Sequence, residues 1–109
     1  MAGERALADY YPGSKETFQT SLGERRVDRV EYQGDNIFAR EAKNFKTRIG
    51  ANQHVLQEAM KDWELKQTFA QIGKRYIPEW HFFDAGPSKT LTNVLNSFGI
   101  RITRYTHHG

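Results

Sequence analysis

The segment of residues 79–105 constrains the fold more than any other part of the chain. Pro78 cannot donate to a strand ladder, so we expect a strand to begin after it, at residues 79–83. The nearly continuous apolar bulk of that strand indicates burial on both of its faces. Ser88 is a suitable N-cap for the helix that follows, and residues 100–105 then form the last strand. A strand, a helix and a strand in this order predict two parallel strands joined by a right-handed crossover.

The first half of the chain predicts an antiparallel arrangement. Residues 3–11 carry a short helical repeat that ends at Pro12 and Gly13. Apolar and polar residues then alternate in three segments separated by turn residues, which is typical of strands with one buried face. These segments are residues 15–22, 25–32 and 36–44. We therefore expect a three-stranded antiparallel meander.

A long helix is expected after Gly50, up to about Ile72. Leu56, Met60 and Trp63 recur at helical spacing and predict the buried face of this helix. The resulting element order, α-β-β-β-α-β-α-β, predicts an α/β fold with a mixed sheet. The 109 residues fit a single domain that spans the whole chain.

Two acids and a lysine mark the second and third predicted strands. Twelve residues separate Asp28 from Glu41, and residues 33–36 are typical of a turn, so both carboxylates are expected at one end of a hairpin. Glu41 and Lys43 are two residues apart in a strand, which puts them on the same face, roughly 6–7 Å apart along it. Carboxylate oxygens suit Mg²⁺, and a neighbouring lysine can orient water or neutralise charge on a phosphate. The pattern favours metal-dependent cleavage of a phosphodiester.

These residues resemble the signature of the PD-(D/E)XK nuclease superfamily, which has the restriction-endonuclease fold. The likeness spans about residues 3–73, with Asp28 as the first acid and Glu41-Ala42-Lys43 as the (D/E)XK motif; Val27 stands in place of the proline. The resemblance implies a restriction-endonuclease-like core and catalytic roles for Asp28, Glu41 and Lys43. It further implies one or two Mg²⁺ or Mn²⁺ ions, held by the two carboxylates and the Ala42 carbonyl.

Within that superfamily, the chain looks most like the small nuclease domains at the C-termini of bacterial secreted and contact-dependent toxins. The residues that carry this likeness are Gly23, Arg25, Arg26 and Asp28, the Glu-Ala-Lys strand, and Gln53 in the helix after it. The likeness implies a toxin that acts in the cytoplasm of a target bacterium after delivery within a larger secreted protein. It also implies a cognate immunity protein, and supporting roles in the site for Gln53 and for Glu4, the early candidate for a further glutamate.

Composition limits the remaining chemistry. The chain has no cysteine, which excludes disulfides, thiol catalysis and cysteine-bound zinc, so a metal must be held mainly by carboxylates. No long apolar stretch is present, and we expect no membrane partner. The net charge is +3, and the cations that gather around the proposed acids predict contacts with a nucleic-acid backbone. The predicted contact residues are Arg25, Arg26, Arg29, Arg40, Lys46 and Arg48.

Other polar and aromatic residues have structural interpretations. Glu58 and Asp62 are expected to be exposed charges on the long helix. Trp63 and Trp80 have the spacing of core residues, and His81, within an apolar strand, is expected to be a buried histidine with satisfied hydrogen bonds.

Three classes of function are compatible with the sequence. The first is a metal-dependent endonuclease; no base-reading motif is visible, and DNA is only slightly favoured over tRNA as its substrate. The second is a non-catalytic basic module that binds nucleic acid, in which the acids merely balance the cations. The third is a structural domain whose hairpin carries exposed, incidental ion pairs.

Overall fold

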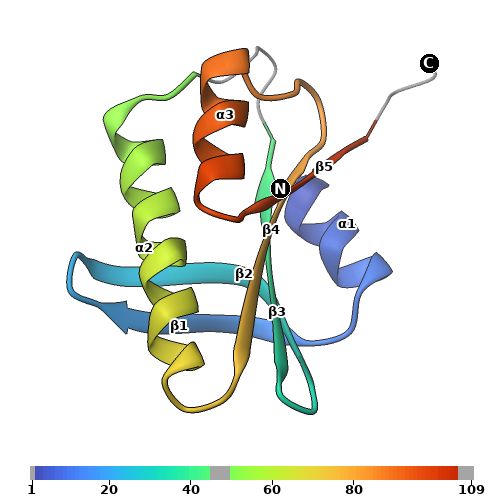
Figure 1. Ribbon diagram of the computed structural model, residues 1–109. Coiled ribbons are helices and arrows are strands. Elements are labelled where there is room, and N and C mark those ends of the chain that lie inside the picture. The colour runs from blue at the N-terminus through green and yellow to red at the C-terminus, as the bar shows by residue number, and fades with distance from the viewer. Residues whose placement is uncertain (1, 45–49, 106–109) are drawn as a thin grey trace.

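Five strands form one mixed sheet, in the spatial order β1-β2-β3-β4-β5 (Figure 1). The computed structural model describes residues 2–44 and 50–105 of the chain. The strands are β1 (Ser14–Thr20), β2 (Gly23–Gln33), β3 (Asn36–Lys43), β4 (Arg75–Phe82) and β5 (Arg101–Arg104). The first three strands pair antiparallel, as the predicted meander requires, while β4 is parallel to both β3 and β5.

Among the described residues, three helices cover the sheet, and the predicted element order and α/β class are confirmed. The helices are α1 (Ala2–Tyr10), α2 (Gln53–Ala70) and α3 (Lys89–Ser97). In Figure 1, α2 and α3 lie side by side over one face of the sheet, and α1 lies apart from them. The side chain of Asn52 caps α2 by accepting from the Val55 amide, and Ser88 caps α3 as predicted by accepting from the Leu91 amide at 3.1 Å.

The core lies between the sheet and the α2–α3 layer. Trp80 and Phe82 of β4 pack there against buried residues of both helices, which are Val55, Ala59, Leu91 and Leu95. A second cluster forms between the meander and the C-terminal half of α2, around Val27, Ile37 and Leu65. Burial of Trp80 is confirmed, since its side chain is inaccessible to solvent.

The prediction that β4 begins after Pro78 is wrong, because β4 begins at Arg75. Pro78 lies inside the strand, opposite Ala39 of β3. On the other side of β4, the pairing with β5 covers only residues 79–82. A proline is tolerated because one side of the strand has no ladder at this position.

The predicted buried face of α2 is also wrong. The buried residues are Val55, Ala59, Asp62 and Leu65, whereas Met60 is 44% exposed and Trp63 is 45% exposed. Both sets recur with helical spacing and lie on neighbouring stripes of the helix. The larger side chains therefore do not mark the side that faces the sheet.

No helix in residues 2–44 and 50–105 combines the length and the apolar character that a membrane span needs.

Candidate functional site

Asp28 and Glu41 lie at the end of the β2–β3 ladder. The paired residues run from Gln33–Asn36 at the turn to Arg29–Arg40, and the two acids come directly after this last pair. Oδ2 of Asp28 accepts a hydrogen bond from the Ala42 amide at 2.8 Å. The first acid is thereby tied to the strand that carries the second acid and the lysine.

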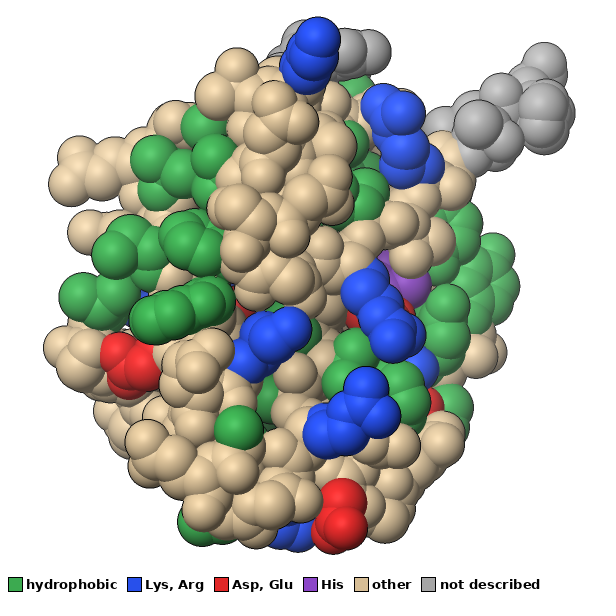
Figure 2. Space-filling view, viewed as in Figure 1, with side chains coloured by type: hydrophobic (Ala, Val, Ile, Leu, Met, Phe, Trp, Pro, Cys, Tyr) green, Lys and Arg blue, Asp and Glu red, His purple; other side chains and the backbone are tan. Residues whose placement is uncertain are grey.

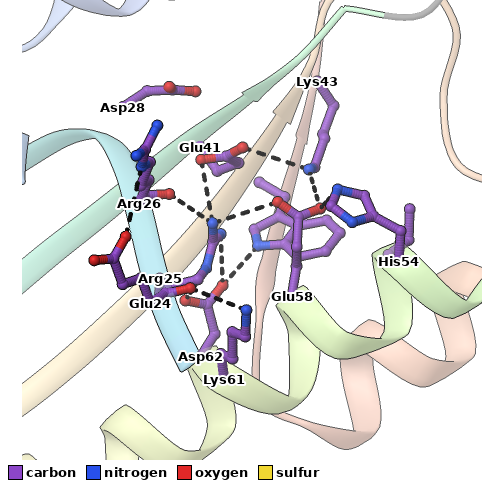
Figure 3. Close-up of polar contacts among 12 residues, drawn as sticks. Glu24, Arg25, Arg26, Asp28, Glu41, Lys43, His54, Glu58, Lys61 and Asp62 are labelled. Carbon is purple, nitrogen blue, oxygen red and sulfur yellow. Dashed lines mark hydrogen bonds and ion pairs between the residues drawn. The ribbon is translucent and has the colours of Figure 1, made fainter. Parts of the chain in front are cut away.

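Glu41 and Lys43 share the face of β3 that points toward α2 (Figure 3). The Lys43 Nζ atom lies 3.4 Å from Glu41 Oε2 and 2.7 Å from Glu58 Oε1 on α2. It also lies 4.6 Å from the centroid of the Trp80 ring, within range of a cation–π interaction. Lys43 is only 5% exposed, so carboxylates and an indole face hold its ammonium in place rather than water.

A cavity of about 250 Å³ opens over these residues. Its lining consists of Glu4, Asp28, Glu41, Ala42, Lys43, Asn44, His54 and Glu58. The structure thus brings together both acids, the lysine, the Ala42 backbone and the early glutamate of the sequence hypothesis. These residues and the rest of the lining come from α1, the β2–β3 hairpin and α2, which are three separate segments of the sequence.

The Glu41 carboxylate has an unusual environment. Oε1 is buried and has no hydrogen-bond partner among the described residues. The guanidinium of Arg25 is the cation next to it, but Arg25 Nη1 lies 3.6 Å away, beyond hydrogen-bonding distance. A buried oxygen in this condition is costly unless a further ligand binds it.

Burial raises the pKa of Glu41 to about 7, although Arg25 and Lys43 act in the opposite direction. Burial also raises the pKa of Asp28, while the hydrogen bond from Ala42 opposes this rise. Each acid therefore holds its proton more tightly than an exposed carboxyl group does, and the two negative charges disfavour one another.

Arg25 does not belong to a nucleic-acid surface, which corrects the sequence prediction. Its side chain is 3% exposed and lies between the sheet and α2. Nε donates to Asp62 Oδ1 at 2.9 Å and Nη2 donates to Asp62 Oδ2 at 3.1 Å, a bidentate pair. Nη1 donates to the Arg26 carbonyl at 2.7 Å and lies 3.4 Å from Glu58 Oε2. Arg25 supports the site from inside.

Arg40 is likewise an internal residue and not a phosphate contact. It is 6% exposed; Nη1 donates to Glu31 Oε1 at 2.6 Å and Nε donates to Glu79 Oε1 at 3.1 Å. The same Glu79 oxygen lies 3.1 Å from His81 Nε2, and His81 Nδ1 lies 2.8 Å from the Tyr105 hydroxyl. The prediction of a buried, satisfied histidine is confirmed.

The remaining predicted contact residues have different positions. Arg26 is 81% exposed at its side chain, 3.9 Å from Glu24, and stays available as a surface cation. Arg29 is half-buried, with its Nε donating to the Tyr11 carbonyl at 3.0 Å. Lys46 and Arg48 lie outside the described residues. Gln53 is exposed and is not among the described residues that line the cavity.

Sequence reasoning missed two acids of α2. Glu58 contacts both Lys43 and Arg25, and Asp62, at 1% exposure, accepts from Arg25, Tyr76 and Trp80. The expectation that both acids are exposed is therefore wrong. A signal was present: Asp62 lies three residues after the buried Ala59, and Arg25 shares its strand parity with buried Val27, so an inward cation required an inward acid.

The donor set of the cavity fits a hard divalent cation. Carboxylate and carbonyl oxygens are the preferred ligands of Mg²⁺ and Mn²⁺, and Glu41 Oε1 is a buried oxygen that accepts no hydrogen bond from the described residues. No group of three or more His, Asp or Glu side chains within residues 2–44 and 50–105 has the arrangement of a metal site. The candidate donor set is smaller, since it comprises two carboxylates and one backbone carbonyl.

Comparison with solved structures shows similarity to protein AF1548, whose crystal structure was described as that of a protein of unknown function. The two chains superpose with a TM-score of 0.63 at 15% sequence identity, over 97% of this chain and 58% of the other. This chain thus spans little more than half the length of that protein, and the likeness establishes a shared fold. No family model matches the sequence, and no curated protein matches it.

Proposed function

We propose that the domain is a metal-dependent nuclease that cleaves nucleic-acid phosphodiesters. The observation that supports this most strongly is the convergence of Asp28, Glu41 and Lys43 on one cavity, from two strands, with the Ala42 backbone between them. A structural ion-pair cluster would not require a buried Glu41 oxygen that accepts no hydrogen bond from the described residues, or a cavity above it. Two acids with raised pKa values in a cavity also favour a functional site over a structural one.

Each residue has a distinct role in this proposal. Asp28, Glu41 and the Ala42 carbonyl would hold a divalent ion, which when bound supplies a positive charge that polarises the phosphate. Lys43 donates hydrogen bonds from a fixed position, either to the attacking water or to the negative charge that develops on the phosphate. Glu58 is a positioning residue, because it holds the Lys43 ammonium beside Glu41.

The biological role of the domain is inferred from the resemblance alone. The restriction-endonuclease-like core has the same element order as this chain, and Glu41-Ala42-Lys43, which resembles the (D/E)XK motif, lies on β3. We further propose a bacterial toxin domain, delivered within a larger protein, that acts in the cytoplasm of the target cell. Its immunity protein would be a partner that covers the cavity.

The decisive experiment incubates the purified domain with plasmid DNA and with total tRNA, each with and without Mg²⁺ or Mn²⁺. We expect cleavage of at least one substrate that requires the metal and stops on addition of EDTA. Binding of both nucleic acids without cleavage in any metal would instead favour the non-catalytic binding module.

The acid pair predicts a specific response to pH. The pKa of Glu41 rises from 4.5 in the unfolded chain to about 7 in the folded domain, so the folded state binds the extra proton between these values. The metal-free domain should therefore lose stability as the pH rises from about 4.5 to about 7, and Glu41→Gln should remove most of this slope. Thermal melts at several pH values measure it.

Metal binding should reverse that loss. A divalent ion binds the ionised pair in the folded state, so saturating Mg²⁺ should raise the melting temperature at neutral pH and progressively less as the pH falls. Asp28→Asn and Glu41→Gln should abolish both this effect and cleavage, whereas Glu24→Gln, on the exposed part of β2, is the matched control. Calorimetric titration that detects neither Mg²⁺ nor Mn²⁺ would contradict the metal site.

A further inference from the structure

A second cavity, of about 360 Å³, adjoins the candidate site. Its lining consists of Glu4, Arg5, Ala8, Lys15, Asp28 and Arg29. Glu4 and Asp28 also line the first cavity, so the two spaces meet at these acids. Lys43 and Glu41 lie on one side of this boundary, and three cations lie on the other.

The three cations of the second cavity come from three elements. Arg5 is an exposed residue of α1, and Lys15 of β1 is 66% exposed at its side chain, with Nζ 3.7 Å from Glu4 Oε2. Arg29 of β2 is half-buried, and the bond from its Nε to the Tyr11 carbonyl fixes the guanidinium at the cavity wall. The cavity is thus lined by two exposed cations, Arg5 and Lys15, and by one guanidinium, that of Arg29, which a hydrogen bond holds in place.

The burial of Arg25 and Arg40 makes this cluster important. Both were predicted to contact a nucleic-acid backbone, yet each is bound to internal carboxylates.

Figure 2 shows that exposed lysine and arginine side chains also gather on the face that carries α2 and α3, so a basic surface alone does not locate the path of a nucleic-acid strand. A strand whose phosphodiester is cleaved beside Lys43 carries further phosphates on either side, and these need cations of their own. Among the described residues that line the two cavities, the cations on the far side of Asp28 from Lys43 are Arg5, Lys15 and Arg29. These three residues can contact the neighbouring phosphates.

We propose that the second cavity is a binding site for a backbone phosphate of the nucleic-acid substrate, adjacent along the strand to the phosphodiester that is cleaved. This inference rests on the proposed function and names the substrate as a polynucleotide strand. Arg29 supplies a directed guanidinium to the phosphate oxygens, and Arg5 and Lys15 supply charge that adapts to the path of the strand.

Binding of a fluorescently labelled single-stranded DNA oligonucleotide tests the site without cleavage. The measurement uses the Lys43→Ala protein without metal, over a series of salt concentrations. Adding Arg5→Gln and Lys15→Gln should weaken binding and flatten the slope of log K against log salt by about 0.7 for each phosphate that the protein no longer neutralises. Both side chains are exposed, so the fold should be kept. Arg5→Glu, made separately, changes the charge of the cavity by the same amount as the double variant and should also weaken binding.

The matched control removes the same charge at the far end of the sheet. Lys74→Gln with Arg75→Gln acts where β4 begins, opposite Asn36, whereas the site lies at the Lys43–Phe82 end of the same strand pair. This control should leave the salt slope unchanged. An unchanged slope in the Arg5 and Lys15 variant, or an equal loss in the control, would overturn the phosphate site.

Cleavage assays separate this inference from the proposed function. With active protein, the Arg5 and Lys15 variant should raise KM for the oligonucleotide while a dinucleotide, which has no second phosphodiester, is cleaved as by the wild type. Normal oligonucleotide cleavage by the variant would refute the phosphate site alone. Salt-dependent binding that follows Arg5 and Lys15, without cleavage in any metal, would refute the nuclease and retain the site. A wild-type protein that binds no nucleic acid would refute both.

Discussion

Replacing Asp62 with alanine is expected to lower the free energy of unfolding by about 3–5 kcal/mol, because it leaves a buried guanidinium without its partner. Asp62 accepts four hydrogen bonds at 2.9–3.1 Å, two from Arg25, one from the Tyr76 hydroxyl and one from the Trp80 indole. Its removal therefore affects β2, β4 and α2 together. Urea denaturation followed by circular dichroism measures the change.

The control for this substitution is Glu64→Ala, on the same helix. Glu64 accepts a hydrogen bond from the Ser21 amide at 2.6 Å at the surface, where water can take the place of the carboxylate. Little change in stability is expected there. If Asp62→Ala unfolds at nearly the same urea concentration as wild type, the buried charge network does not hold α2 against the sheet.

Replacing Lys43 with alanine is expected to reduce cleavage by about 100- to 1,000-fold or more, the loss seen when a fixed donor to developing charge is removed. Metal binding should persist, because an ammonium cannot coordinate a cation. Single-turnover cleavage at saturating Mg²⁺ measures the effect, and calorimetry confirms that the ion still binds.

Two further variants define the role of the ammonium. Lys43→Arg should restore little activity, because a planar guanidinium does not fit the position that Glu58 and the Trp80 ring define for a compact charge. Lys61 provides the control, because its Nζ donates to the Glu24 carbonyl at the surface. The Lys61→Ala variant should cleave like wild type. Turnover near the wild-type rate in Lys43→Ala would remove the (D/E)XK assignment.

The hairpin was predictable from sequence because its information is local. The alternation of apolar residues indicated the register of the strands, and a spacing of two placed Glu41 and Lys43 on one face. Asp28 lies directly after the last ladder pair, as the turn length required, and binds the Ala42 amide. Strand geometry alone thus accounts for most of the candidate site.

What sequence reasoning could not supply was the rotation of α2 about its axis. Two adjacent stripes carry helical periodicity, and the one with the bulkier residues, including Trp63, lies partly exposed. The buried stripe carries Asp62, whose partners Arg25, Tyr76 and Trp80 come from β2 and β4. The contact with Arg25 turns a predicted phosphate-binding arginine into an interior residue. Such pairings join residues far apart in sequence. Strand parity indicates that the Arg25 side chain points inward, but it does not identify the acid that Arg25 meets.

The ion pairs between β2, β3 and α2 have a consequence for the charge of the site as a whole. Arg25 and Lys43 carry two positive charges, and Glu58 and Asp62 carry two negative charges, so the interior group is formally neutral. Glu4, the other acid that lines the cavity, is paired with Lys15 at 3.7 Å. The acids of the hairpin, Asp28 and Glu41, are then the surplus, with a formal charge of −2 when both are ionised. One divalent cation brings this total to zero, whereas a monovalent cation leaves it at −1. Electroneutrality therefore favours Mg²⁺ or Mn²⁺ over Na⁺ or K⁺ in this cavity, independently of ligand geometry.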